Sequence, residues 1–364
     1  MKIFEQAKIG DLLLNNRMVM APMTRSRADD KGIIGDLTVK YYEQRASAGL
    51  IISETINISP DAIGMPNTPG LFNTDQVFAW KKVTDAIHGA GGKIFAQLNH
   101  SGRAAHSINR KGKVISGPSA IPIKGQQAFT SEGLKDFETP EVLTEQDIQM
   151  IIRDYKIAAQ YAKDAGFDGV ELHAAMGFLP NQFLMESSNQ RDDQYGGSFE
   201  NRSRFIVETM QALIEIFGKQ RVGIRLSPSI LLHDMHDRNP VGLYTHLIGS
   251  LDKLPIAYFH LIQPLFPLDK DSVYPHDVLL EFGDLITSDI IVNGGYTKEK
   301  AEMEIETGRS QFVSFGSLFL ANPDLVRRFK ENSIINSPDK ETMYSGGDEK
   351  GYTDYPFLYE DSTH

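Results

Sequence analysis

Short runs of apolar and β-branched residues recur along the chain and alternate with longer stretches whose apolar residues are spaced three and four apart. Eight such runs occur, each six or seven residues long. They are Arg17–Met23, Leu50–Ile56, Lys93–Leu98, Gly169–Ala175, Val222–Ser227, Ala257–Gln263, Asp289–Gly294 and Gln311–Gly316. Runs of this kind predict buried strands, and the periodicity between them predicts helices.

Three of the predicted helices carry terminal signals. The sequence Thr144–Asp147 has the pattern of a capping box and precedes an apolar helical stripe. A second stripe begins near Phe205 and stops at Gly218, a residue typical of helix ends. A third helix is predicted to start at Asn322-Pro323, as an N-cap followed by proline at the first helical position.

Eight alternations of strand and helix predict an α/β protein with a (β/α)8 TIM barrel. The main alternative, a doubly wound sheet, would need a glycine-rich turn after the first strand, and Ala21–Arg25 contains no glycine. Ile3-Phe4 and Leu12–Leu14, around Gly10-Asp11, predict an N-terminal hairpin that closes the bottom of the barrel. We expect a single domain over residues 1–364, with a C-terminal tail from about residue 333 packed over or near the active face.

Composition narrows the class of protein. The 364 residues include no cysteine, which excludes disulfides, thiolate nucleophiles and cysteine-ligated metal centres. The formal net charge of −11 argues against a nucleic-acid partner. No apolar run is long enough to span a membrane, and Glu5 and Asp11 interrupt the region where a signal peptide needs an apolar core. We therefore expect a cytoplasmic protein, either monomeric or homodimeric.

Polar side chains fall late in three predicted strands. Gln97, His173 and Arg225 each lie near the carboxyl end of a strand, where active sites of TIM barrels are built. Because a buried, unpaired charge is costly, something anionic or electron-rich should meet Arg225. A purely structural alternative is that Arg225 pairs with a carboxylate such as Glu54 or Glu171.

The last two strands end in glycine turns, and two loops are long. Asn293-Gly294-Gly295 follows the seventh strand and Phe315-Gly316-Ser317 the eighth, where barrels often hold phosphate with backbone N–H groups. This position predicts a phosphorylated cofactor. The connections 99–143 and 176–197 also follow strands, and long loops at this end of a barrel are usually functional.

Five motifs in order make the chain resemble the old yellow enzyme family of FMN-dependent ene-reductases, from about Phe4 to Pro356. The motifs are Asn16–Arg25, Gln97–Arg103, His173–Ala175 with Gln182–Leu184, Arg191–Ser198 with Glu200–Arg202, and Ala321–Leu325, and the tail Gly351–Pro356 also fits. The resemblance implies a TIM barrel with FMN at its C-terminal mouth.

The resemblance also implies roles for individual residues. Pro22, Met23 and Thr24 would line the isoalloxazine, with the Thr24 hydroxyl near its O4/N5 edge. Gln97 would bind the pyrimidine edge, and Arg225 would lie against N1 and O2, where a guanidinium stabilises the anionic reduced flavin.

Further positions complete the implied cofactor site. Thr55 would contact the flavin through its backbone, and Gly294, Gly295 and Gly316 would hold the phosphate. In this family NADPH, or less often NADH, reduces the flavin, which passes hydride to an activated alkene. Two side chains bind the substrate's oxygen, and a tyrosine supplies the proton.

The chain departs from the family pattern at the substrate pocket. His173 and Thr24 would carry the catalytic chemistry, but the second donor position holds Met176, which cannot donate a hydrogen bond. Phe178 stands at the position of the proton-donating tyrosine. Asn99 replaces a tryptophan of the pocket.

Two more positions bear on cofactor and proton supply. Ser317 replaces an arginine on the phosphate side, which removes one charged contact and leaves the backbone cradle. Tyr344 aligns with a tyrosine near the substrate pocket and is a candidate substitute proton donor.

These substitutions predict an FMN-dependent oxidoreductase with an altered small-molecule acceptor range. Reduction of simple enones should be weakened, and electron-poor acceptors such as quinones and nitro compounds should be favoured, because water can protonate their reduced oxygens. The alternatives are a flavin- or ligand-binding relative with little turnover, and a lyase or demethylase built on the same scaffold.

Overall fold

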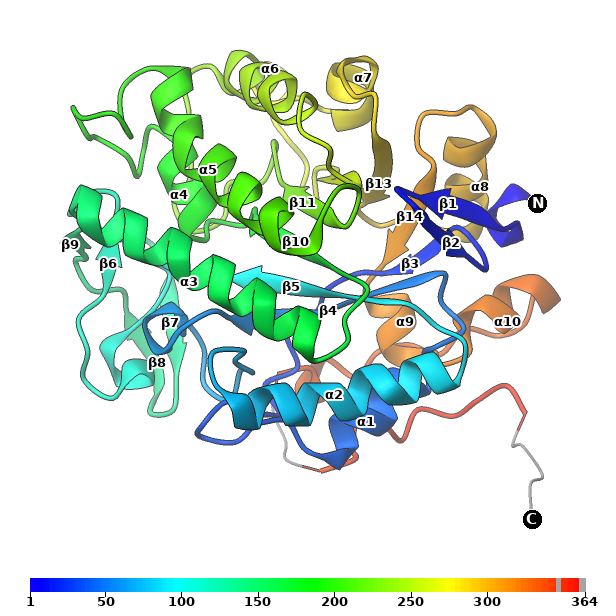
Figure 1. Cartoon of the computed structure of the whole chain (residues 1–364). Coiled ribbons are helices and arrows are strands. Elements are labelled where there is room, and N and C mark those ends of the chain that lie inside the picture. Colours follow the sequence, from blue (N-terminus) through cyan, green and yellow to red (C-terminus); the bar gives the residue numbers. More distant parts are fainter. Residues whose placement is uncertain (345–347, 360–364) are drawn as a thin grey trace.

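Eight parallel strands close into a barrel with helices around it in the computed structural model (Figure 1), which describes residues 1–344 and 348–359. The strand order around the barrel is β10-β11-β12-β13-β14-β3-β4-β5. The strands are β3 (Met18–Met20), β4 (Leu50–Asn57), β5 (Ile94–Asn99), β10 (Gly169–Ala174), β11 (Val222–Leu226), β12 (Tyr258–Ile262), β13 (Asp289–Asn293) and β14 (Phe312–Phe315). The predicted (β/α)8 fold is confirmed.

The helices connect successive strands on the outside of the barrel. They are α1 (Asp36–Glu43), α2 (Thr74–Gly89), α3 (Glu145–Asp164), α4 (Leu179–Leu184), α5 (Phe199–Phe217), α6 (Pro240–Leu251), α7 (Val278–Phe282), α8 (Lys298–Glu306), α9 (Ser317–Ala321) and α10 (Leu325–Glu331). Short 3-10 turns are η1 (Lys2–Phe4), η2 (Pro60–Ala62), η3 (Ser107–Arg110), η4 (Gly283–Leu285) and η5 (Lys340–Thr342). No helix in the described part of the chain is long and apolar enough to cross a membrane.

Two of the predicted helix ends are confirmed and one is wrong. Thr144 caps α3 in a capping box with Asp147, and α5 ends at Gly218 with a positive φ. However, α10 begins at Leu325 with Asp324 as its N-cap. The oxygen that a cap would use, Asn322 Oδ1, instead accepts from the Asn336 N–H at 2.7 Å, and Nδ2 donates to the carbonyls of Leu318 and Asn336.

The first strand is shorter than its apolar run, because Pro22 lacks the N–H that a ladder needs. Its last barrel hydrogen bond joins the Ala21 N–H to the Phe315 carbonyl at 3.1 Å. The chain then leaves the barrel as a loop, and this brings Thr24 and Arg25 over the barrel mouth.

A hairpin of β1 (Ala7–Ile9) and β2 (Leu12–Leu14) closes the bottom of the barrel, as predicted. Its apolar side chains form one cluster with the lower barrel interior, namely Ile9, Leu12 and Leu14 with Val19, Leu50, Ile52, Phe95, Ala257, Tyr258, Ile291 and Phe312. Ile3-Phe4 does not join the hairpin, contrary to the prediction, but lies in η1. The arrowhead of β5 in Figure 1 points away from this hairpin.

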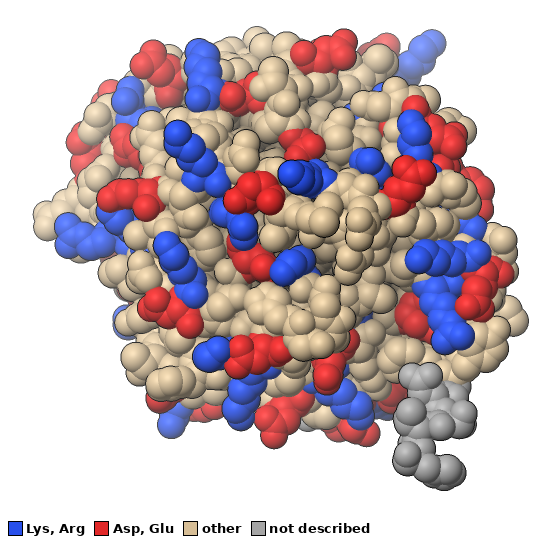
Figure 2. All heavy atoms as spheres, turned by 45° about the vertical axis from the view of Figure 1, so that its right-hand side comes forward, with Lys and Arg blue, Asp and Glu red and all other residues tan. Residues whose placement is uncertain are grey.

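The opposite end of the barrel carries the long connections. The 99–143 connection contains β6 (Ser116–Gly117), β7 (Gln127–Thr130), β8 (Gly133–Asp136) and β9 (Glu141–Val142), which lie on the side toward which β5 points in Figure 1. Figure 2 shows acidic and basic side chains interspersed over one face of the molecule. The net charge of −11 is therefore not gathered into a patch on that face.

Candidate active site

Strand register brings the predicted polar residues together at the barrel mouth. His173 on β10 lies opposite Arg225 on β11, and Arg225 lies opposite His260 on β12. Gln97 on β5 lies opposite Thr55 on β4 and Glu171 on β10. Paired residues of adjacent parallel strands share a face, so these side chains form a polar layer above the apolar lower interior.

A chain of hydrogen bonds runs through this layer. The Thr55 hydroxyl donates to Gln97 Oε1 at 3.0 Å, and Gln97 Nε2 donates to Glu171 Oε1 at 2.7 Å. The second carboxylate oxygen of Glu171 lies 2.9 Å from His260 Nδ1, and His260 Nε2 lies 2.8 Å from the Ser314 hydroxyl. Gln97 keeps one amide hydrogen free of these contacts, which suits the donor role toward a pyrimidine edge.

Arg225 is held by an amide and not by a carboxylate. Its Nη2 donates to Asn293 Oδ1 at 3.0 Å, and Asn293 Nδ2 in turn donates to the Ser314 carbonyl at 3.1 Å. The alternative in which Arg225 forms an ion pair with Glu54 or Glu171 is wrong: among the described residues no carboxylate lies within ion-pair distance of it. The Glu54 carboxylate instead accepts from the Arg25 backbone N–H at 3.2 Å.

The electrostatics of Arg225 fit an electron-rich ligand. Burial lowers the pKa of Arg225 to about 10, opposed by the charge of Glu171, so the guanidinium stays positive near neutral pH. Its Nε is buried without a hydrogen-bond partner. A charged donor without a partner can donate to the flavin N1–O2 edge, which is the ligand that the resemblance implies for Arg225.

His173 is a neutral donor with an unused nitrogen. Burial, and then the charge of Arg225, lower the pKa of His173 well below its ordinary value. Its Nδ1 is buried without a hydrogen-bond partner, and its ring meets the Phe178 ring edge-on at 4.8 Å. A neutral imidazole in this setting can donate one hydrogen bond to a substrate oxygen.

Met176 lies in a left-handed turn directly after β10. Its φ is +59°, its N–H donates to the Ser227 hydroxyl at 2.9 Å, and its carbonyl lies 2.8 Å from His233 Nδ1. The Met176 side chain packs against an apolar cluster that includes Ile230 and Ile262. It therefore fills a gap in the wall.

Phe178 lies between two histidine rings. Its ring centre is 4.8 Å from that of His173 and 5.9 Å from that of His233. Phe137, from the 99–143 connection, also meets the His233 ring edge-on, with 5.8 Å between the ring centres. The wall of the mouth beyond His173 is thus aromatic and has no hydroxyl at position 178.

Asn99 and Tyr344 lie in different surroundings. Asn99 is buried at the end of β5, where Nδ2 donates to the Ser101 hydroxyl at 3.2 Å and Oδ1 has no hydrogen-bond partner. Tyr344 is 52% exposed and follows η5 in the C-terminal tail. The preceding carbonyl, of Met343, accepts from Arg25 Nε at 3.2 Å, so the tail is fastened to the loop that carries Thr24.

The loop with Pro22, Met23 and Thr24 is partly buried and follows the carboxyl end of β3. Its end is anchored by Arg25, whose guanidinium lies 4.9 Å from the ring of Tyr41 and 5.0 Å from the ring of Tyr352, two rings that stack on each other. Cation–π contacts of this kind hold an arginine without a carboxylate. The segment expected to line the isoalloxazine is therefore fixed at one end by β3 and at the other by Arg25.

The two glycine turns share a cavity. Gly294 and Gly295 have φ of +127° and +67°, and Gly295 and Ser317 both line a cavity of about 520 Å³ together with Lys298 and Arg328. Left-handed glycines turn backbone N–H groups toward a common point, as anion sites require. Gly316 immediately precedes α9, and Ser317 is its exposed first residue.

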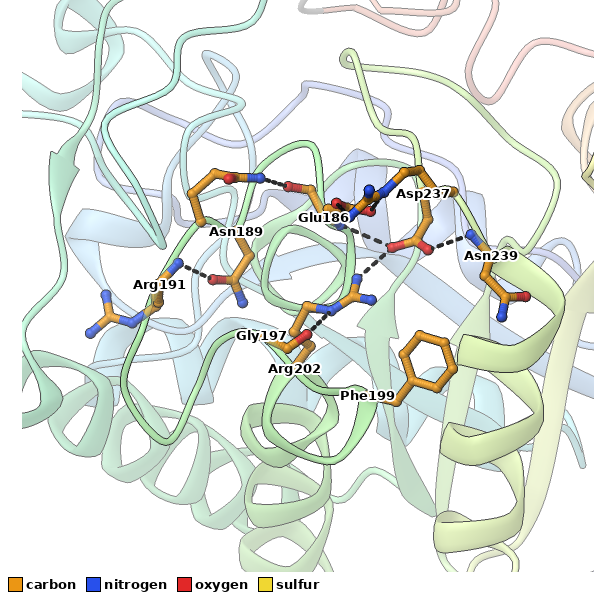
Figure 3. Close-up of a pocket in the computed structure, with 10 residues that line it drawn as sticks. Glu186, Asn189, Arg191, Gly197, Phe199, Arg202, Asp237 and Asn239 are labelled. Atoms are coloured by element: carbon orange, nitrogen blue, oxygen red, sulfur yellow. Dashed lines mark hydrogen bonds and ion pairs between the residues drawn. The ribbon is translucent and has the colours of Figure 1, made fainter.

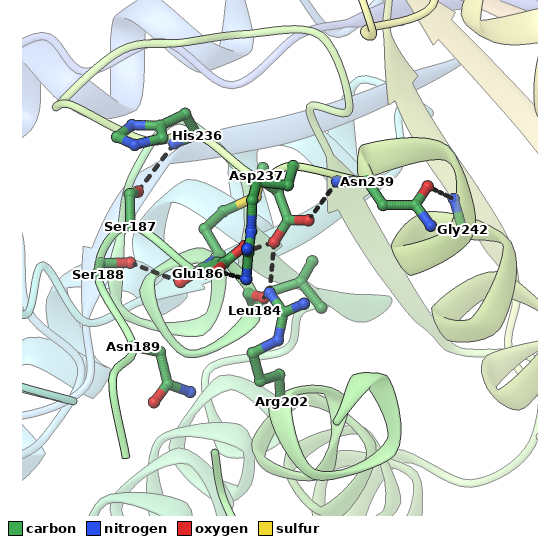
Figure 4. A network of polar contacts seen from close by, with 12 residues as sticks. Leu184, Glu186, Ser187, Ser188, Asn189, Arg202, His236, Asp237, Asn239 and Gly242 are labelled. Atoms are coloured by element: carbon green, nitrogen blue, oxygen red, sulfur yellow. Dashed lines mark hydrogen bonds and ion pairs between the residues drawn. The ribbon is translucent and has the colours of Figure 1, made fainter. Parts of the chain in front are cut away.

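A second cavity, of about 570 Å³, lies apart from these residues and holds the Arg191–Arg202 motif (Figure 3). Its central contact is the buried ion pair of Arg202 and Asp237 at 2.5 Å. Asp237 also accepts from the Glu186 and Asn239 backbone N–H groups (Figure 4). This motif joins the loops after β10 and β11 and serves the architecture of the mouth.

Sequence reasoning missed three members of the polar layer. Asn293, His260 and Ser314 orient Arg225 and Glu171 but stand in strands interpreted as apolar. The sequence did contain a signal for His260, because it stands between the apolar residues Phe259 and Leu261 and so faces the opposite side of β12 from them.

Comparison with known proteins gives concordant matches over nearly the whole chain. The sequence model of the NADH:flavin oxidoreductase / NADH oxidase family matches residues 2–336. A 12-oxophytodienoate reductase 1 of Oryza sativa subsp. japonica is 39% identical over 355 residues, which cover 97% of this chain and 92% of that protein. A flavin oxidoreductase of Emericella nidulans is 39% identical, covering 98% of this chain and 97% of its own.

Solved structures agree with these matches. Morphinone reductase in complex with tetrahydroNAD superposes with a TM-score of 0.93 at 42% identity, over 100% of this chain and 99% of that one. The old yellow enzyme homologue from Zymomonas mobilis superposes with a TM-score of 0.94 at 37% identity, over 98% and 99% of the two chains.

Proposed function

The chain belongs to the NADH:flavin oxidoreductase / NADH oxidase family, which includes the old yellow enzymes, and from this premise we propose that it reduces bulky, electron-poor acceptors such as quinones, nitro compounds and strongly activated alkenes. It is an FMN-dependent oxidoreductase that takes electrons from a nicotinamide nucleotide. The residues of the pocket bear on which class of acceptor it reduces.

FMN, when bound and reduced by NAD(P)H, supplies a hydride to the acceptor. The residues that would hold FMN are Pro22, Met23, Thr24, Thr55, Gln97, Arg225, Gly294, Gly295, Gly316 and Ser317. The free amide hydrogen of Gln97 and the orphaned Nε of Arg225 are donors of the kind that a pyrimidine edge accepts.

His173 would bind the acceptor's oxygen. It is neutral, buried, and has an unpartnered Nδ1, so it can donate one hydrogen bond in a place that water does not reach freely. A donor of this kind is strengthened by the low dielectric of its surroundings and acts where negative charge develops on the acceptor. Arg225, opposite in register, favours the same accumulation of charge.

The observation that carries the proposal is the packing of Met176 against Ile230 and Ile262 beside a single donor, His173. A pocket that lacks the second donor loses on the order of 3 kcal/mol of transition-state stabilisation for a simple enone. Phe178 supplies no proton, and a missing general acid costs a further factor of about 10²–10⁴ where proton transfer is difficult. Acceptors whose reduced oxygens are protonated by water avoid this second loss.

A direct test compares acceptors with one protein sample. Anaerobic protein with bound FMN should lose its oxidised-flavin absorbance on addition of NADPH or NADH. Quinones and nitroaromatics should then restore that absorbance at least 100-fold faster than cyclohexenone does. Equal rates for quinones and cyclohexenone would contradict the proposed acceptor class, and no reoxidation above the rate with buffer alone would favour a flavin-binding protein with little turnover.

A further inference from the structure

The buried pair of Glu171 and His260 takes no part in the binding roles described so far. Both side chains are 0% exposed, and His260 Nδ1 lies 2.9 Å from Glu171 Oε2. Glu171 precedes His173 by two positions on β10, and His260 lies opposite Arg225. Glu171 therefore lies one inward-facing position below His173, and His260 lies beside Arg225 in the same layer.

The partners of Glu171 define which atoms carry hydrogen. Oε1 accepts from Gln97 Nε2, and a carboxylate oxygen can only accept. With Glu171 ionised, Oε2 likewise accepts, so Nδ1 of His260 carries a hydrogen. The protonation state of His260 is then decided at Nε2, which faces the Ser314 hydroxyl at 2.8 Å.

The Ser314 hydroxyl fits both protonation states of His260. When His260 is neutral, the hydroxyl donates to the bare Nε2. When His260 is protonated, Nε2–H donates to Ser314 Oγ, and the hydroxyl hydrogen turns to the Val292 carbonyl, 3.3 Å away. Rotation of one hydroxyl hydrogen is sufficient, so a proton can be gained without movement of any heavy atom.

The charges of the groups around His260 sum to zero when His260 itself is neutral. Burial lowers the pKa of His260, Arg225 lowers it further, and Glu171 raises it. Tyr258, on the same strand, stays neutral because burial raises its pKa well above its ordinary value, and His173 is neutral as described. One negative charge, on Glu171, thus faces one positive charge, on Arg225.

We propose that His260 takes up one proton when the bound flavin is reduced, and so compensates the negative charge that appears against Arg225. This inference rests on the proposed function, which places the flavin N1–O2 edge at Arg225. The nicotinamide nucleotide supplies two electrons and one hydrogen to the flavin, and solvent water supplies the second proton, which binds His260 Nε2. No other group is oxidised or reduced.

The proton count separates this role from a purely structural one. For a two-electron couple, each proton taken up changes the midpoint potential by about 30 mV per pH unit. In the wild-type holoprotein, His260 has one pKa when the flavin is oxidised and a higher one when it is reduced. Between these two pH values the midpoint potential should change by about 60 mV per pH unit. The His260→Gln variant, whose amide can still bind Glu171 and Ser314, should give about 30 mV per pH unit throughout.

Two further variants sharpen the comparison. Ser314→Ala removes the hydroxyl that binds Nε2 in both protonation states, and the lost hydrogen bond is stronger for the charged Nε2–H, so the steep region should move to lower pH. His88→Gln is the matched control, because His88 contacts Asp168 at the opposite end of the barrel. Its slope should equal that of the wild type.

Nitrogen-15 NMR of histidine-labelled wild-type protein tests the same proton without a variant. Nε2 of His260 should change from the unprotonated to the protonated chemical-shift range when the flavin is reduced. Equal slopes in wild type and His260→Gln, or an unchanged His260 signal, would overturn the inference and leave the proposed function intact. Failure of the wild-type protein to bind FMN or to be reduced by NADPH or NADH would overturn both.

Discussion

The backbone carbonyl of Met176 lies 2.8 Å from Nδ1 of His233, and this contact fixes the residue that distinguishes the pocket. Together with the bond from the Met176 N–H to Ser227, it holds position 176 at a φ of +59°. The direction of the side chain at this position is therefore set by the loop and not by the methionine. Asparagine tolerates the left-handed region better than methionine does.

Met176→Asn should consequently add a hydrogen-bond donor without straining the backbone, although it gives up the packing of methionine against Ile230 and Ile262. The asparagine side chain would leave Cα in the same direction as that of methionine, three positions after His173. We expect kcat/KM for cyclohexenone to rise by about 10²-fold, in line with the value of one added donor in a transition state. Met176→Leu is the control, and steady-state kinetics with both variants are the measurement. A rise of the same size in Met176→Leu would contradict the role of the donor.

Phe178→Tyr should restore a proton donor. The hydroxyl would be added to a ring that already lies 4.8 Å from His173, so the ring need not move. We expect the rate of cyclohexenone reduction to rise by about 10²-fold over that of the wild type. The rate with quinones should change little, because quinones need no protein acid. Rates of flavin reoxidation in single turnovers with each acceptor are the test. A gain of equal size with quinones would show that the hydroxyl acts by another route.

Much of this site follows from local patterns in the sequence. The alternation of polar and apolar residues predicted that Gln97, His173 and Arg225 converge, because strand ends meet at one rim in a barrel. The partners of these residues were not predictable in the same way. Asn293 is 68 positions from Arg225, and His260 is 89 positions from Glu171, so each pairing depends on how the barrel closes.

The errors in the predicted elements have a related cause. Asn322 stands at a sequence position typical of a helix cap, but its Oδ1 accepts from the backbone N–H of Asn336, which belongs to the C-terminal tail. For Arg225 the sequence left open pairing with a carboxylate, yet its contact with Asn293 and its unused Nε leave it available for a ligand. In both cases a tertiary contact decided between options that the local sequence left open.

Asp237→Asn should destabilise the fold more than most single substitutions. Asp237 and Arg202 form a buried ion pair, and removal of one partner of such a pair leaves an uncompensated charge. We expect a loss of about 3–5 kcal/mol in the free energy of unfolding, measured in urea. Glu200→Gln, which weakens an exposed contact with Arg204, is the control and should change stability by less than about 1 kcal/mol. Equal losses in both variants would contradict the special cost of the buried pair.

Ser317→Arg should strengthen the binding of FMN and leave riboflavin unaffected. Ser317 is the exposed first residue of α9 and lines the cavity shared with Gly295, so a guanidinium there is accommodated at the surface. A charged hydrogen bond to phosphate should lower the Kd for FMN by about 10- to 100-fold. Riboflavin, which lacks phosphate, is the matched ligand, and Ser317→Gln is the matched uncharged variant. Flavin fluorescence titrations of the apoprotein would detect the difference, and an equal gain for riboflavin would refute it.

The Glu54→Gln variant should be more stable than the wild type, and this gain in stability should be larger at alkaline than at acidic pH. Burial raises the pKa of the Glu54 carboxyl to about 7, although contacts with Arg25 oppose this. Between its unfolded pKa and pH 7, the folded protein therefore binds more protons than the unfolded chain, so stability falls as pH rises through this interval. Ionisation of buried Glu54 therefore lowers the free energy of unfolding, and this loss reaches its full value of about 3 kcal/mol above pH 7.

The glutamine side chain can still accept the Arg25 N–H, so the loop that carries Thr24 should stay anchored. We expect the free energy of unfolding of Glu54→Gln to exceed that of the wild type by more at pH 8 than at pH 5, by up to about 3 kcal/mol. Urea unfolding of both proteins at the two pH values measures this difference directly. The exposed Glu132→Gln variant should show no such dependence, since its side chain stays largely in water. A constant difference between the Glu54→Gln variant and wild type across pH would mean that Glu54 is already ionised throughout this range, held so by Arg25.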